Sequence, residues 1–264
     1  MMPAFVSRGD GHFLHVSDWG DGPPVLFLAG WAMDSRIWGE TRLRLNDAGL
    51  RTIAYDRNGH GRSTDRATYS YDDLADDLAE VMRSLHLSNV TLVAHSGAGG
   101  EAIRYLSRYN GNQIKRLILV GATGPKVIGV GGVTPEMVER LCGELTSNLS
   151  GWIDANIDPF APGAHRRVKD WMGSMAMDCS RRALVAFQQT IALSNLSAEA
   201  HDLKLPVTII HGDCDVSAPL ESSGRVYAAT IPGAELVVYE GVAHGIMVTH
   251  ASRLANDISG RVLA

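Results

Sequence analysis

Short apolar segments alternate with stretches of helical pattern along this chain, and this alternation limits the possible folds more than any other feature. The segments are rich in β-branched residues, and each ends at polar or glycine-rich residues. Strands that alternate with helices form a mostly parallel sheet covered on both faces. The sequence therefore predicts an α/β fold with strands at residues 13–18, 25–29, 51–55, 90–94, 117–120, 207–211 and 235–239.

The first two of these segments are predicted to form a hairpin, with its turn at residues 20–24. Apolar residues recur at helical spacing in residues 69–87, where Ser70 followed by Asp73 is typical of a capped helix start. Further helices that would cover the sheet are predicted at residues 97–109, 220–230 and 249–262.

The alternation stops between residues 120 and 207, where no strand pattern occurs. Helical patterns lie instead at 134–147, 163–177 and 180–195, and Thr134 before Pro135 is typical of a helix start. We therefore predict a core of residues 1–121 and 205–264 with a helical cap, 122–204, inserted into it. The run VIGVGGV at 127–133 fits either a hinge that leads into the cap or a plain surface loop.

The composition limits the kinds of molecule that this protein is expected to bind. The 264 residues carry a formal net charge of -5 and no dense Lys/Arg run, which does not favour nucleic-acid binding. The three cysteines form no CxxC pair, so neither structural zinc nor a disulfide framework is expected. No signal peptide is recognisable, and no apolar run reaches the ~20 residues that span a bilayer. We expect a cytoplasmic protein with a small-molecule partner and no membrane contact; the sequence leaves the oligomeric state open, a homo-oligomer included.

The segment AHSGAGGE, residues 94–101, is the first candidate for chemistry. Ser96 lies where a predicted strand meets a predicted helix, which is the setting of a nucleophile elbow. The usual pattern is G-x-S-x-G, and here Ala94 and Ala98 stand at the two glycine positions. The alternative is a serine that caps a glycine-rich helix start. Three glycines in the segment favour close packing and therefore the nucleophile.

A serine nucleophile needs a histidine base that is held by a carboxylate. In this fold the chain order is serine, acid, histidine, and active groups gather at the carboxyl ends of parallel strands. Of the later strand-end loops, the one after 207–211 contains Asp213 and Asp215, and the one after 235–239 contains His244. We therefore predict Ser96, Asp215 and His244 as the catalytic residues, with Asp213 as the competing acid.

The oxyanion of an acyl-transfer intermediate needs two N–H donors. One is expected from the backbone of Gly97, directly after the serine, and the other from the loop after residues 25–29. That loop begins AGW, so the amide of Trp31 is the candidate, and Gly30 allows close approach of the backbone. The substrate pocket is expected to be lined by Trp31 and by apolar residues of the cap, which could equally form the cap's own core: Trp152, Phe160, Trp171, Met172 and Met175.

Five segments together resemble the α/β-hydrolase fold family, and within it the cofactor-free bacterial haloperoxidase and aryl-esterase branch. They are AGWAMDSRIW, IAYDRNGHGRS, HSGAGGEAIRYLSRY, PVTIIHGDCDVSAPLESSGR and VYEGVAHGIMVTHASRLANDI, in this order along the chain. The resemblance implies an eight-stranded, mostly parallel sheet with flanking helices and a helical cap. It also implies a serine hydrolase that uses no metal and no organic cofactor, with Ser96, Asp215 and His244 in the roles given above.

The sequence departs from that branch beside the elbow and in the oxyanion loop. Ala94 and Ala98 replace glycines, Ala29 replaces a common histidine, and Ala32 stands where proline is often found. In this branch the acyl-enzyme can react with hydrogen peroxide to give a peracid, and the departure at residue 32 weighs more against that side reaction than against hydrolysis.

The function predicted from the sequence is hydrolysis of a carboxylic ester, lactone or related acyl bond through an acyl-enzyme, with perhydrolysis as a side reaction. Cofactor-free oxygenation and carbon–carbon bond hydrolysis on the same scaffold are alternatives, because both could keep a serine–histidine pair. A ligand-binding receptor with a slow triad is a third. Dehalogenation and epoxide opening through an ester intermediate are disfavoured, since they need a carboxylate at position 96.

Overall fold

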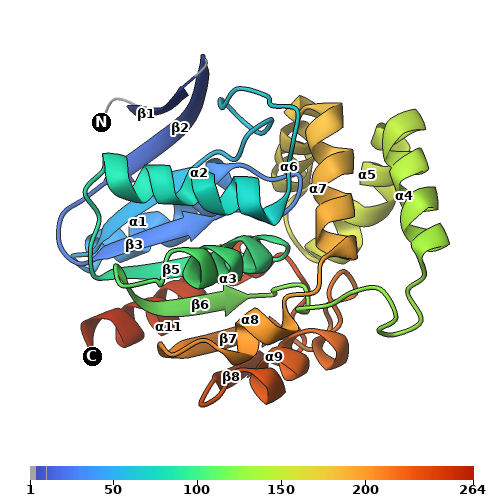
Figure 1. The fold of residues 1–264 in the computed structure, drawn as a ribbon. Coiled ribbons are helices and arrows are strands. Elements are labelled where there is room, and N and C mark those ends of the chain that lie inside the picture. The colour runs from blue at the N-terminus through green and yellow to red at the C-terminus, as the bar shows by residue number, and fades with distance from the viewer. Residues whose placement is uncertain (1–3, 10) are drawn as a thin grey trace.

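The computed structural model describes residues 4–9 and 11–264, which form one eight-stranded sheet flanked by helices (Figure 1). The spatial order is β1-β2-β4-β3-β5-β6-β7-β8. The six strands from β3 to β8 pair in parallel, whereas β2 is antiparallel to both β1 and β4. The strands are β1 (Ala4–Gly9), β2 (His12–Trp19), β3 (Pro24–Leu28), β4 (Arg51–Tyr55), β5 (Val90–His95), β6 (Ile114–Val120), β7 (Val207–Gly212) and β8 (Glu235–Tyr239).

The predicted mostly parallel sheet is confirmed, but two details at its beginning were wrong. The hairpin between β2 and β3 does not form, because β4 lies between them and pairs with both. The continuously apolar β3 is buried on both faces and takes two parallel neighbours, so that Leu26 lies beside Ile53 and Leu92. The edge strand β1 was missed, because an edge strand needs no long apolar run to form.

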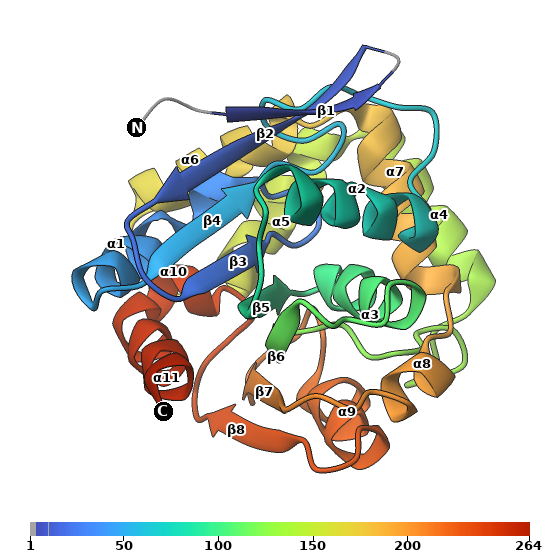
Figure 2. The same ribbon diagram turned by 60° about the vertical axis from the view of Figure 1, so that its left-hand side comes forward.

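Helices cover both faces of the sheet (Figure 2). On one face α1 (Gly39–Asp47) packs against α11 (Ala251–Leu263), and the preceding turns are η1 (Ser35–Trp38) and α10 (Ile246–Thr249). The other face carries α2 (Tyr71–Ser84), α3 (Ala98–Arg108), α8 (Ser197–His201) and α9 (Gly224–Thr230), which follows η2 (Leu220–Ser222). Each face has its own cluster of buried apolar side chains against the sheet.

The predicted helix start at Ser70 is confirmed by its hydrogen bonds. The Ser70 hydroxyl accepts from the Asp73 N–H at 3.1 Å, and the Asp73 carboxylate accepts from the Ser70 N–H at 3.0 Å. This reciprocal pair satisfies two N–H groups that the first turn of a helix leaves without partners. The Thr134 hydroxyl likewise accepts from the Met137 N–H at 3.3 Å.

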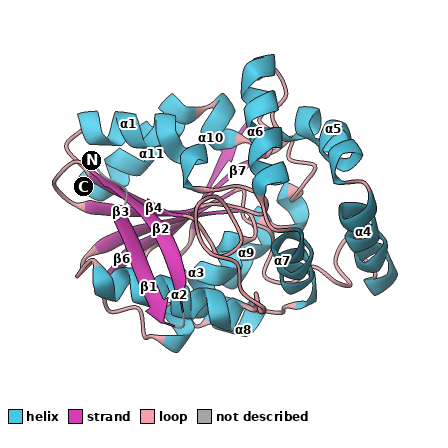
Figure 3. Ribbon diagram, turned by 90° about the horizontal axis from the view of Figure 1, so that it is seen from above, coloured by secondary structure: helices cyan, strands magenta, loops and turns pink. Residues whose placement is uncertain are grey.

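Between β6 and β7 the regular elements are all helices. The helices α4 (Pro135–Ser147), α5 (Leu149–Phe160), α6 (Arg166–Asp178) and α7 (Arg181–Leu193) group together beyond the ends of the strands (Figures 1 and 3). The sequence did not indicate α5, whose pattern is interrupted by Gly151 and Pro159. A division into core and cap at residues 122 and 204 stays a prediction. No helix in the described part of the chain is long and apolar enough to cross a membrane.

Candidate active site

Ser96 lies on a strained turn between β5 and α3. Its φ is 56°, in the left-handed region that few residues other than glycine adopt. The two alanines that replace the usual glycines, Ala94 and Ala98, are fully buried, so the packing around this turn accommodates a methyl group on each side. From this turn the serine hydroxyl reaches His244 in the loop after β8.

Gly30 shows how closely the neighbouring loop approaches this turn. A Cβ at position 30 would lie 2.5 Å from His95 Nδ1 and 3.0 Å from Ser96 Cβ. We therefore expect Gly30→Ala to displace the serine, to lower the free energy of unfolding by about 1–3 kcal/mol through overpacking, and to remove most catalytic activity.

Gly39→Ala is the matched control for this substitution. Gly39 has helical dihedrals, and a Cβ there would meet nothing within 4 Å. Alanine at this helical position should therefore keep or slightly raise the stability. Chemical unfolding and ester turnover of both variants check the prediction, and a fully active Gly30→Ala would contradict it.

Three loops at the strand ends bring Ser96, His244 and Asp215 into one hydrogen-bonded chain. His244 Nε2 lies 3.0 Å from Ser96 Oγ, and His244 Nδ1 lies 2.6 Å from Asp215 Oδ2. The other carboxylate oxygen of Asp215 accepts from the backbone N–H groups of Ser217 at 2.9 Å and Ala218 at 2.8 Å. With its second oxygen held in this way, the Asp215 carboxylate presents a fixed acceptor to the imidazole.

Asp213 and His250, the competing acid and histidine, lie outside this chain of contacts. Asp213 Oδ1 accepts from the Gly241 N–H at 2.7 Å and so joins the loop after β7 to the loop after β8. His250 lies between α10 and α11, where its Nδ1 is 2.9 Å from the Thr249 hydroxyl. No hydrogen bond or ion pair in the described structure joins either residue to Ser96 or His244.

Two further buried histidines support the loops that carry His244 and Asp215. His95 Nε2 lies 3.3 Å from the backbone oxygen of His244, and the two rings are 4.6 Å apart. Burial, and then the neighbouring His244, hold the pKa of His95 well below its usual value, so its ring is neutral and can donate one N–H. His211 Nε2 lies 2.7 Å from the Ala218 oxygen, and burial lowers its pKa as well.

The two predicted oxyanion donors lie on segments beside Ser96. Gly97 follows the serine directly, and within the described residues neither its N–H nor that of Trp31 has a backbone acceptor. The Trp31 indole N–H donates to the Leu184 oxygen of α7 at 2.8 Å, and its ring meets Trp152 edge-on at 5.1 Å. The indole therefore anchors the oxyanion loop to the helices above it.

A cavity of about 370 Å³ opens over Ser96 and His244. Among the predicted pocket residues, Trp31, Trp152, Phe160 and Met172 line it. The remaining lining residues that the sequence did not indicate are Ala32, Met33, His95, Thr123, Val127, Leu141, Ile153, Asn156, Ile157, Ala176, Gln188, Ile191 and Ser217. No Asp, Glu, Lys or Arg lines the part of the cavity that the structure describes.

The prediction was wrong for two pocket residues, both on α6. Trp171 is 37% exposed on the outer side of the helix, and Met175 is buried in the apolar cluster over the α1 and α11 face of the sheet. The helix turns its Met172 side toward the cavity, and the sequence pattern of α6 does not reveal which of its apolar residues faces the substrate.

The loop of residues 55–63 supports the site without entering the cavity. Its Asp56 carboxylate accepts from the backbone N–H groups of Ser35 and Arg62, each at 2.9 Å, and so holds two loops together. His60 is fully buried in this loop, and burial, followed by the charge of Arg57, lowers its pKa to about 4.

We expect His60 to make stability dependent on pH. Its pKa falls from 6.5 to about 4 on folding, so the unfolded chain binds the proton more strongly between these values. This contribution of about 3 kcal/mol is present above pH 6.5 and is lost as the pH falls through 4. Relative to His60→Asn, the wild type should lose that amount between pH 7 and 4 in urea unfolding. Parallel stability curves would contradict the assignment.

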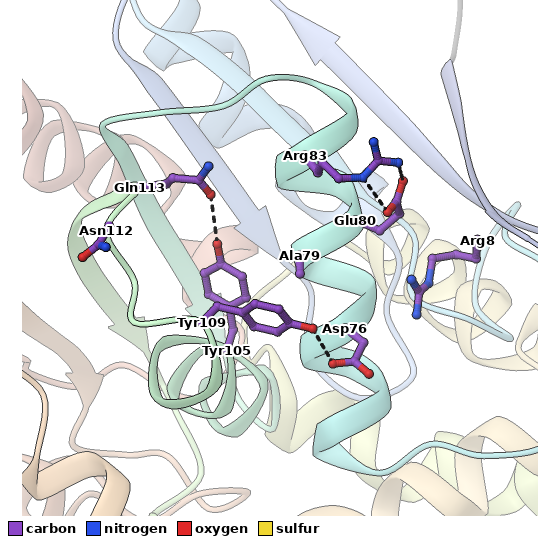
Figure 4. Close-up of a pocket in the computed structure, with 9 residues that line it drawn as sticks. All are labelled: Arg8, Asp76, Ala79, Glu80, Arg83, Tyr105, Tyr109, Asn112 and Gln113. Atoms are coloured by element: carbon purple, nitrogen blue, oxygen red, sulfur yellow. Dashed lines mark hydrogen bonds and ion pairs between the residues drawn. The ribbon is translucent and has the colours of Figure 1, made fainter.

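A second hollow, more open to solvent, lies between α2 and α3 and shares no lining residue with the cavity over Ser96. Figure 4 shows that its polar side chains pair with one another: Tyr109 with Asp76, Tyr105 with Gln113, and Arg83 with Glu80. Because these groups satisfy each other, the hollow offers few free groups to a ligand. Among the residues that the structure describes, no three His, Cys, Asp or Glu side chains are grouped to hold a metal ion.

Comparisons with known proteins agree with this architecture. The family model described as alpha/beta hydrolase fold matches residues 23–251. The chain is 36% identical to the non-heme chloroperoxidase CPO-A1 of Kitasatospora aureofaciens over 93% of each chain. It is 30% identical to the bifunctional esterase/perhydrolase DCH of Acinetobacter calcoaceticus, over 96% of this chain and 97% of that one. An esterase from Exiguobacterium antarcticum superposes with a TM-score of 0.95 at 27% identity, over 100% of both chains.

The chain belongs to the α/β-hydrolase fold family. Within this family it falls in the branch that contains haloperoxidases and esterases, as its sequence motifs predicted. It is therefore an enzyme of the hydrolase type.

Proposed function

We propose that this enzyme hydrolyses a carboxylic ester, lactone or related acyl bond through an acyl-enzyme on Ser96. The single observation that carries the proposal is the chain of contacts from Ser96 Oγ through His244 to Asp215, at 3.0 and 2.6 Å, beneath a cavity. A base within hydrogen-bond reach of a hydroxyl, itself oriented by a carboxylate, is the arrangement that activates a serine.

In the proposed reaction, Ser96 Oγ attacks the carbonyl carbon while His244 Nε2 accepts the hydroxyl proton. Asp215 keeps the proton of His244 on Nδ1 and stabilises the imidazolium that forms. The negative oxygen of the tetrahedral intermediate is stabilised by the N–H groups of Gly97 and Trp31. His244 then protonates the leaving oxygen, and a water molecule activated by the same imidazole releases the acid and regenerates Ser96.

The cavity supports a neutral and mainly apolar acyl substrate. Its described walls carry no Asp, Glu, Lys or Arg side chain and are largely aromatic or aliphatic. A charged acyl group would lose its hydration there without gaining a partner, which is costly. The names of the esterase and perhydrolase relatives point to the same bond class.

Peracid formation is proposed only as a side reaction, in which hydrogen peroxide replaces water at the acyl-enzyme. Ala32 adopts a φ of 60°, which the ring of proline cannot reach. A loop with proline at this position would therefore need a different backbone, so this chain cannot share that loop conformation unchanged.

Labelling with a fluorophosphonate probe, followed by digestion and mass spectrometry, tests the proposal. We expect one adduct on Ser96, together with turnover of small neutral esters and lactones and slower turnover of esters with a carboxylate in the acyl group. Adding hydrogen peroxide and bromide during turnover of a neutral ester measures the side reaction, because the peracid that forms oxidises bromide. Ester turnover without modification of Ser96 would overturn the mechanism, and oxygen uptake without hydrolysis would favour an oxygenase.

A further inference from the structure

Arg57 is a buried charged residue that the proposed reaction does not use. Its side chain is 3% exposed, and that of its partner Glu101 is 0% exposed. Arg57 Nη2 donates to Glu101 Oε2 at 2.6 Å, and Nε donates to the same oxygen at 3.0 Å. A buried ion pair adds little net stability, because the loss of hydration offsets the attraction between the charges. The position of this pair therefore needs another explanation.

The remaining donors of Arg57 bind the backbone of the oxyanion loop. Nη2 donates to the Ala29 oxygen at 2.8 Å, and Nη1 donates to the Gly30 oxygen at 3.4 Å. The Gly30 oxygen belongs to the same planar peptide group as the N–H of Trp31, and in a trans peptide the two point in opposite directions. A guanidinium that holds the Gly30 oxygen therefore also fixes the direction of the Trp31 N–H.

Glu101 connects the same guanidinium to the other oxyanion donor. It lies in the first turn of α3, the helix that begins directly after Gly97. The Tyr55 hydroxyl also donates to the Glu101 carboxylate, so the carboxylate is held from two sides. Arg57 and Glu101 thus join the two backbone segments that carry the proposed donors.

The surroundings of Arg57 leave it little freedom to move. Its guanidinium lies 4.3 Å from the centre of the Phe187 ring on α7, and Phe187 is fully buried. Arginine presents several N–H donors in a rigid plane, whereas lysine carries one compact charge on a flexible stem. Lysine at this position could retain the charge, but it could not hold Glu101 and both carbonyl oxygens in one geometry.

We infer that Arg57 is a positioning residue for the oxyanion hole. It holds the N–H groups of Trp31 and Gly97 in their relative positions through the carbonyls of residues 29 and 30 and through Glu101. The inference rests on the proposed acyl-transfer function. Arg57 would therefore affect the stability of the transition state, whereas the cavity walls would bind the substrate.

Arg57→Lys tests this role, with Arg42→Lys as the matched control. Arg42 is also buried, and its guanidinium also donates to backbone oxygens, those of Ser17 and Thr52, at 3.1 and 2.9 Å. It lies outside the cavity and the oxyanion loop. The control therefore reports the cost of replacing a buried arginine that is not connected to the site.

For Arg57→Lys we expect kcat on a small aryl ester to fall by about 10²-fold, because misplaced donors stabilise the oxyanion less. KM should stay within about threefold of the wild type, since the ground-state contacts are unchanged. An aryl trifluoromethyl ketone, whose adduct carries an oxyanion, should bind more weakly in proportion to kcat/KM. The corresponding secondary alcohol, which forms no oxyanion, should bind as before. Arg42→Lys should lower only the stability.

The double variant Arg57→Met/Glu101→Gln replaces the ion pair by neutral side chains of similar size. It is the second test of the inference if Arg57→Lys does not fold. It should show the same loss of kcat. Values of kcat near the wild type in the folded variant, or an equal loss of kcat in Arg42→Lys, would overturn the inference. If the wild type neither turns over esters nor labels at Ser96, the proposed function fails instead, so the two failures are distinguishable.

Discussion

Ser96→Ala is expected to lower kcat for small aryl esters by about 10⁶-fold, the loss seen when the nucleophile of a serine–histidine pair is removed. The hydroxyl is the group that bonds to the acyl carbon, and no other hydroxyl in the described structure lies at hydrogen-bond distance from His244 Nε2. The fold should be retained, because alanine is smaller than serine and the turn keeps the same backbone strain at φ 56°. Kinetics on purified protein and circular dichroism with thermal unfolding measure the two outcomes.

Ser174→Ala is the matched control for this substitution. Ser174 is exposed on α6, where its hydroxyl donates to the Asp170 oxygen at 2.9 Å, and it lies outside the cavity. This variant should keep wild-type kcat and react with the fluorophosphonate probe, which Ser96→Ala should not. A Ser96→Ala protein that is folded and still turns over esters at the wild-type rate would exclude the covalent mechanism.

The sequence predicts the three residues of the hydrogen-bonded chain because they depend on topology. Because these strands are parallel, the loops after β5, β7 and β8 all lie at the carboxyl ends of the strands, whatever the packing around them. The choice between Asp213 and Asp215 was less determined, since both follow the same strand. It depends on where the loop turns, and the turn that Ser217 and Ala218 close around the Asp215 carboxylate is visible only in three dimensions.

The cavity walls could not be predicted in the same way. A helix with apolar residues on several sides can present any of them to a neighbour, so α6 gave no sign that Met172 rather than Trp171 would face the substrate. Gln188 and Ile191 also face the cavity from α7, three positions apart and so on one side of the helix. That spacing was readable from the sequence, but the orientation of the helix toward the site was not.

The pairing of the first strands also could not be predicted from the sequence alone. The continuous apolar run of β3 indicated a strand covered on both faces, which is correct. Its partners were chosen wrongly because neighbours in sequence were taken to be neighbours in space, while β4 is inserted between β2 and β3. Strand identity depends on local pattern, whereas pairing depends on the whole sheet.

Asp215→Asn should produce the second large effect, a fall in kcat of about 10⁴-fold, as measured for the equivalent change in a serine protease. Asparagine can still accept from the N–H groups of Ser217 and Ala218, so the loop should keep its shape. Its amide NH₂ would then face His244 Nδ1 in place of the carboxylate oxygen now 2.6 Å away. The imidazole would carry its proton on Nε2, which faces Ser96, and could not accept the serine proton.

Asp213→Asn separates this explanation from a general effect of charge removal at the loop. The two variants lose the same charge two residues apart, but the oxygen that Asp213 offers to the Gly241 N–H survives as an amide oxygen. We therefore expect the kcat of Asp213→Asn to lie within a few-fold of the wild-type value. Asp215→Asn, although slow, should keep a KM and a thermal stability close to those of the wild type. Steady-state kinetics and differential scanning calorimetry on both proteins decide the matter. If Asp213→Asn is the variant with the large loss of kcat, the orienting carboxylate has been assigned to the wrong residue, although Ser96 and His244 could keep their roles.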